Sequence, residues 1–118
     1  MGGTVAIDAK IDSSATVSAG AIVHSMAEIG RDSEISRGVI IYSRARIGIG
    51  VKIMEDSIVG FGTAIGDGTS IGQSVSVENG VAIGVRAKLG AYSSVYSGAI
   101  IRDDEGIRPH SMVLPPRK

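Results

Sequence analysis

The stretch IGIGVKIMEDSIVGFGTAIGDGTSIG, residues 47–72, places an isoleucine or valine at every sixth position. The same spacing of aliphatic residues extends in both directions without exception, from Val5 to Val113. Alternation with a period of two indicates an ordinary strand and a period near 3.6 indicates an amphipathic helix, so a period of six fits neither. A fixed short period is typical of a repeat architecture in which stacked units share one core. The sequence therefore predicts a coil of short strands, each with one inward aliphatic side chain and a turn after it.

Two further positions of the repeat are restricted. The residue four places after each aliphatic residue is small or β-branched through most of the chain, as at Ala45, Ser57 and Thr63, which suits a tight inner corner. Glycines recur three places after the aliphatic residue, as at Gly50 and Gly62, where a turn would need a positive φ that glycine adopts freely. Both features predict that the corners of the coil repeat every six residues, as its strands do.

The repeat resembles the [LIV]-[GAED]-x-x-[STAV]-x pattern of the hexapeptide-repeat superfamily, which includes acyltransferases and γ-class carbonic anhydrases. This resemblance implies an all-β fold, a left-handed parallel β-helix of triangular section in which three hexapeptides form one coil. We therefore expect a single domain over residues 1–118, with about six coils, no inserted loop, and tails at 1–4 and 114–118. At a strand spacing of about 4.8 Å, the predicted prism is roughly 29 Å tall.

Composition narrows the classes of partner. The chain has 12 basic and 12 acidic residues, and this balance is not the basic footprint expected of a nucleic-acid-binding protein. There are no cysteines for disulfides or a thiolate metal site. No apolar run approaches the length of a membrane span, and the first ten residues lack the pattern of a signal peptide. The expectation is a cytoplasmic protein without a metal, nucleic-acid or membrane partner.

One of the three predicted faces is apolar. Residues 18 apart should stack on adjacent coils, and the residues on either side of each inward aliphatic residue should point outward. A contiguous apolar patch usually marks an interface, so we expect self-association through this face. The superfamily resemblance implies a homotrimer, with room for a small-molecule ligand between subunits. The predicted interface residues are Ile22, His24, Ile40, Tyr42, Ile58, Phe61, Tyr96 and Met112.

His24 is the candidate catalytic residue. In the acyltransferases that the chain resembles, a histidine at a subunit boundary acts as general base on the acceptor, a task that suits an imidazole near neutral pH. The family histidine usually stands two places after the aliphatic residue, whereas His24 stands one place after Val23. The family's long loop over the acceptor and its C-terminal helix have no counterpart in this sequence. The main expectation is therefore a non-catalytic assembly or binding module. The alternative is an acyltransferase that uses acetyl-CoA, and a further alternative is a portion of a longer protein.

The segment at residues 101–106 resembles the Arg-x-Asp-Glu-Gly stretch of γ-class carbonic anhydrases. That resemblance implies that Arg102 and Asp104 help hold a trimer and that Glu105 assists proton transfer. A catalytic zinc needs three protein ligands, and downstream of this segment only His110 is present, so this activity is the least favoured alternative. Glu105 occupies an inner-corner position, where it is either a buried carboxylate that contacts an anion or metal or a solvent-exposed residue of the last coil. The 18-residue spacing also places Arg86 beside Asp104.

Overall fold

The computed structural model describes residues 3–116, and in this part of the chain 19 strands of two residues each follow one another without a helix. The strands form three parallel sheets, named here sheets A, B and C. Sheet A contains β1 (Thr4–Val5), β4 (Ile22–Val23), β7 (Ile40–Ile41), β10 (Ile58–Val59), β13 (Ser76–Val77), β16 (Ser94–Val95) and β19 (Met112–Val113). Sheet B contains β2 (Lys10–Ile11), β5 (Glu28–Ile29), β8 (Arg46–Ile47), β11 (Ala64–Ile65), β14 (Ala82–Ile83) and β17 (Ile100–Ile101). Sheet C contains β3 (Thr16–Val17), β6 (Glu34–Ile35), β9 (Lys52–Ile53), β12 (Ser70–Ile71), β15 (Lys88–Leu89) and β18 (Gly106–Ile107).

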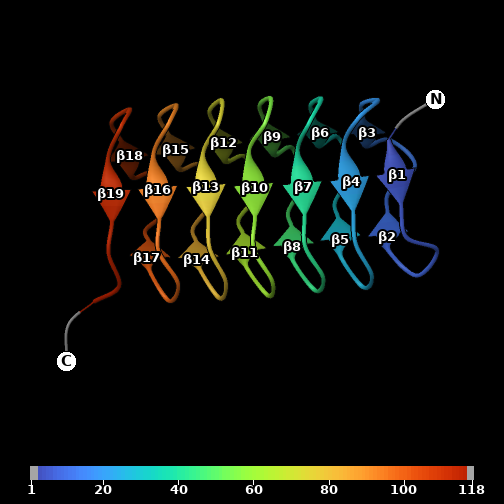
Figure 1. The fold of residues 1–118 in the computed structure, drawn as a ribbon. Helices are drawn as coiled ribbons and strands as arrows, with labels where there is room; N and C mark the ends of the chain where they lie inside the picture. The colour runs from blue at the N-terminus through green and yellow to red at the C-terminus, as the bar shows by residue number, and fades with distance from the viewer. Residues whose placement is uncertain (1–2, 117–118) are drawn as a thin grey trace.

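The coil is left-handed. In Figure 1 the strands of sheet A run downwards at the front, the return strands run behind them, and successive coils advance from right to left. Every strand pairs with the strand three places along the chain, and the paired residues are 18 apart, as in Ile22 with Ile40. The structure thus confirms the predicted left-handed parallel β-helix of about six coils, with no inserted loop among the described residues.

The aliphatic residue of each repeat forms the core. From Val23 to Ile101 this residue is at most 4 % exposed on every strand, and each of these strands except the last, β17, is paired on both sides. Val5 and Ile107 lie on edge strands, where Val5 is 39 % exposed and Ile107 is half-buried. Buried aliphatic area contributes about 25 cal/mol per Å², so this spine is the main source of stability.

Hydroxyl groups at the inner corners link adjacent coils through hydrogen bonds to the backbone. Ser57 Oγ donates to the carbonyl oxygen of Gly72 at 2.7 Å and accepts from the N–H of Val75 at 3.0 Å. Four other buried corner residues repeat this pattern at the same spacing, namely Ser33, Thr63, Thr69 and Ser93. Within residues 3–116 no buried side-chain nitrogen or oxygen lacks a hydrogen-bond partner. A hydroxyl fits this corner because it is small and can both donate and accept.

The turn position three places after many aliphatic residues has a positive φ, as predicted for the glycines there, for example Gly50 (φ 67°). Nine non-glycine residues in the described chain adopt the same conformation, including Arg86 (57°), Tyr92 (64°) and His110 (63°). An L-residue is disfavoured there by roughly 1–2 kcal/mol. The packed coils above and below impose the turn, so their contacts outweigh this local preference.

Candidate functional site

The apolar face lies on sheet A. Ile22, Ile40 and Ile58 occupy equivalent positions on β4, β7 and β10 and form one ladder across three coils. Ile22 is 38 % exposed, and Phe61, in the turn after β10, is 49 % exposed. The register thus confirms the predicted stacking of Ile22, Ile40 and Ile58, and the role of this ladder as an interface stays a prediction.

The rest of the predicted patch is separated from this ladder. Ser76 and Ser94 continue the same row on β13 and β16, so Met112 on β19 stands three strands away from Ile58. Tyr96 follows β16, at that same distant end of the sheet. Sheet A therefore has one compact apolar ladder near the N-terminal coils and a smaller apolar group near β19.

His24 lies beside the ladder and stacks on Tyr42. The two residues follow β4 and β7, and their ring centroids are 5.1 Å apart with an interplanar angle of 2°. Tyr42 is 40 % exposed, and His24 is half-buried. The imidazole is thus on the surface, within the face that the sequence predicts to contact another copy. A second stack of the same kind joins Tyr92 and His110, with centroids 5.2 Å apart, in turns between sheets C and A.

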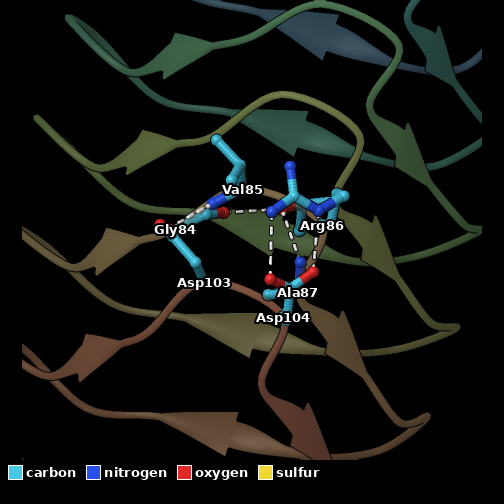
Figure 2. Close-up of polar contacts among 7 residues, drawn as sticks. Gly84, Val85, Arg86, Ala87, Asp103 and Asp104 are labelled. Carbon is cyan, nitrogen blue, oxygen red and sulfur yellow. Dashed lines mark hydrogen bonds and ion pairs between the residues drawn. The ribbon is translucent and has the colours of Figure 1, made fainter.

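Near the C-terminal end of the coil, an ion pair between Arg86 and Asp104 links two adjacent coils. Figure 2 shows Arg86 above Asp104, with Nε to Oδ1 at 2.7 Å and a second nitrogen to Oδ2 at 3.0 Å. Their mutual hydrogen bonds lower the pKa of the Asp104 carboxyl below its ordinary value of 3.8 and raise the pKa of the Arg86 guanidinium. Asp103 accepts from the N–H of Val85 at 2.9 Å and holds the same two turns together.

Glu105 and Arg102 also meet, but within their own turn. The Glu105 carboxylate is exposed and accepts from the N–H of Arg102 at 2.8 Å. The alternative of a buried carboxylate in the inner corner is therefore wrong, because residues 3–116 place no further coil over this position. Among the described residues, no group of three or more His, Cys, Asp or Glu side chains could hold a metal ion.

Sheet B carries a trough that sequence reasoning missed. Gly30, Gly48, Gly66 and Gly84 recur every 18 residues in one column of this sheet. A Cβ at Gly30 would lie 2.6 Å from the carbonyl oxygen of Gly48, so the close approach of the coils excludes a side chain there. The sequence shows this column as glycines spaced 18 residues apart, but the depth of the trough depends on how closely the coils pack.

Two adjacent hollows follow this column, with volumes of about 560 and 330 Å³, and both are lined by Glu28 and Ile47. Lys10 lines the larger hollow and Arg46 the smaller one. Arg46 lies 3.7 Å from Glu28, a loose and exposed pair. The trough therefore combines a floor of bare backbone with a rim that carries both signs of charge, Lys10 and Arg46 beside Asp12 and Glu28.

No family model matches the chain, and no curated protein matches it in sequence. The fold is shared with solved structures of low sequence identity. A GDP-perosamine N-acetyltransferase from Caulobacter crescentus, solved with CoA and GDP-perosamine, aligns with a TM-score of 0.83 and 22 % identity over 88 % of this chain and 50 % of its own. A UDP-N-acetylglucosamine acyltransferase from Francisella novicida aligns with a TM-score of 0.70 and 18 % identity over 92 % of this chain and 54 % of its own.

A hexapeptide transferase family protein from Anaplasma phagocytophilum aligns with a TM-score of 0.63 and 22 % identity over 95 % of this chain and 69 % of its own. The chain spans about half the length of the first two proteins. These likenesses establish that the chain has the left-handed β-helix fold of hexapeptide-repeat proteins. No helix in residues 3–116 is long and apolar enough to cross a membrane.

Proposed function

We propose that the chain self-associates through sheet A and that the assembly is an acyl-CoA-dependent acyltransferase with His24 as its general base. The observation that carries this proposal is the position of His24 beside the Ile22–Ile40–Ile58 ladder, on the face best suited to contact another copy. The fold shared with an N-acetyltransferase solved with CoA supports the same assignment.

The ladder supports an assembly because its side chains are apolar, aligned and partly exposed. Burial of such a side chain against a partner is favourable by about 25 cal/mol per Å² of apolar surface. We propose a homotrimer with parallel prism axes, the assembly that the superfamily resemblance implies. A threefold rotation makes a heterologous contact, so sheet A of one copy faces a different surface of the next.

Sheets A and B meet at the turns that contain Met26 and Phe61. If these turns lie nearest the threefold axis, the ladder and His24 of one copy face sheet B of the next. His24 would then lie opposite the glycine trough of the partner. The glycine floor of the trough leaves room for an elongated donor such as acetyl-CoA, whose phosphates would contact Lys10 and Arg46 rather than the neighbouring Asp12 and Glu28.

In the proposed reaction, the imidazole of His24 accepts a proton from the amine or hydroxyl of the acceptor as that group attacks the thioester carbonyl of acetyl-CoA. The new bond to the acetyl carbon forms, the carbon–sulfur bond breaks, and the thiolate of CoA leaves and takes up a proton. General-base catalysis of this kind contributes roughly 10²- to 10⁴-fold in rate.

The test is the release of free CoA thiol from acetyl-CoA in the presence of an amino sugar such as glucosamine. We expect turnover by the unmodified chain and a loss on the order of 100-fold or more in His24→Asn, with the oligomer intact by light scattering. Turnover that is unchanged in His24→Asn would remove His24 as the base. Calorimetric titration with acetyl-CoA adds an independent readout, and no heat at millimolar ligand would refute the enzyme assignment.

A second candidate, an assembly or binding module without catalysis, is supported by the regularity of the coil. A two-residue strand recurs every six residues from Thr4 to Val113, so no described segment folds over sheet A or sheet B to enclose an acceptor. An intact oligomer that neither binds nor cleaves acetyl-CoA would favour this candidate.

A further inference from the structure

We infer that Tyr42 is a positioning residue, which holds the imidazole plane of His24 by ring stacking on the face proposed to contact another copy. The role in catalysis rests on the proposed function, whereas the fixed orientation of the ring does not. The inference starts from the stacked geometry, with centroids 5.1 Å apart and ring planes within 2° of parallel.

The backbone places the two rings in register. Val23 and Ile41 are ladder partners, and His24 and Tyr42 directly follow them on adjacent coils. The N–H of His24 donates to the carbonyl oxygen of Ile41, and the N–H of Tyr42 donates to that of Val59, both at 2.9 Å. The Cα atoms of both residues are thus held by the sheet, and the remaining freedom of each ring is its side-chain rotation.

The neighbouring coils leave room for a stack of two rings only. The same column of sheet A continues from Tyr42 to Gly60, where a Cβ would collide with the backbone carbonyl group of Glu78, so no side chain is tolerated there. In the other direction the column continues from His24 to Ala6, whose side chain is a single methyl group. Tyr42 is therefore the aromatic neighbour of His24 in this column.

Stacking determines which part of the imidazole is available. One face of His24 lies against Tyr42, and Nδ1 and Nε2 lie in the plane of the ring, so an acceptor would reach them at the edge of the stack. The row of Ile22 and Ile40 lies two residues away on the same outward face. A general base must have its nitrogen in a defined position to act, and small misplacements cost rate.

The second His–Tyr pair offers a matched control. Tyr92 and His110 stack with nearly the same geometry, 5.2 Å and 7°, but they lie in turns and not beside the isoleucine ladder. Replacement of Tyr92 removes an equivalent stack from the molecule without a change at His24.

The experiment compares Tyr42→Leu, Tyr42→Phe and Tyr92→Leu in the full chain. By proton NMR, we expect the ring protons of His24 to be shifted upfield by the Tyr42 ring in the unmodified chain and in Tyr42→Phe and Tyr92→Leu. In Tyr42→Leu they should move downfield. In the acetyl-transfer assay, kcat should fall roughly 10-fold or more in Tyr42→Leu, with KM for acetyl-CoA unchanged, and Tyr42→Phe should retain kcat.

Unchanged His24 resonances in Tyr42→Leu would overturn the inference, and so would a kcat that falls as far in Tyr42→Phe as in Tyr42→Leu. Light scattering measures the mass of the oligomer in each variant. If Tyr42→Leu loses kcat because the oligomer dissociates, then Tyr42 acts in assembly, and this result would also overturn the inference. If the unmodified chain transfers no acetyl group, the proposed function fails, and the NMR comparison still decides whether Tyr42 orients the ring.

Discussion

The hydroxyl of Ser57 donates to the carbonyl oxygen of Gly72, 15 residues along the chain, from a corner that has no solvent exposure. The same oxygen accepts from the N–H of Val75, so one small side chain satisfies two backbone groups on the next coil. Such groups would otherwise be buried without a full set of partners, which is costly.

We predict that Ser57→Ala lowers the free energy of unfolding by about 1–3 kcal/mol, the usual penalty for a buried polar group left without its partner. Urea unfolding measures this change, and an unchanged m-value would show that the folded state has kept its compactness. The control is Ser14→Ala, because Ser14 is an exposed serine that also accepts from a backbone N–H one coil away. An equal loss in both variants would argue against a special role for the buried corner.

The isoleucine ladder predicts the response of the assembly to a buried charge. Ile40→Lys should dissociate the oligomer, because an ammonium group in an apolar contact would have no partner. Met54→Lys is the matched control, since Met54 is exposed on sheet C, away from the proposed interface. Multi-angle light scattering distinguishes the species, and an unchanged mass for Ile40→Lys would remove sheet A as the interface.

The Arg86–Asp104 pair predicts a loss of stability in acid. The folded-state pKa of Asp104 lies below its ordinary value of 3.8, so the unfolded chain takes up the proton first as the pH falls. The contribution of this pair is present above pH 3.8 and declines as the pH falls from that value through the lower pKa of the folded state. Melting temperatures measured from pH 5 to about pH 2 should therefore fall less steeply in Asp104→Asn than in the unmodified chain. High salt should weaken the difference, because both side chains are exposed.

The glycine column of sheet B predicts position-dependent effects of added methyl groups. A Cβ at Gly66 would lie 2.5 Å from the carbonyl carbon of Gly84, so Gly66→Ala must push two coils apart, at a cost of about 1–3 kcal/mol. Gly106, on the last strand of sheet C, is the uncrowded control, because a Cβ there would have no atom within 4 Å, and Gly106→Ala should leave stability nearly unchanged. Thermal unfolding of the two variants tests the comparison, and equal melting temperatures would mean that the trough can widen freely.

The sequence predicts those features of the site that strand register alone determines. Ile22, Ile40 and Ile58 form a ladder, and Arg86 lies beside Asp104, because residues 18 apart are brought to adjacent coils whatever their side chains are. The spacing assigns His24 and Tyr42 to one face, but it does not predict that their rings stack. Their mutual orientation depends on side-chain rotation, which spacing does not specify.

The amino-acid sequence alone determined the succession of short strands and turns, because an aliphatic residue that must be buried recurs at every sixth position from Val5 to Val113. Only the tertiary structure decided the depth of the trough over Gly30 and Gly66, the exposure of Glu105 and the orientation of His24. Those features depend on the distance between coils and on which side-chain rotamers the neighbouring coils leave open, and both quantities are set by contacts between residues far apart in the chain.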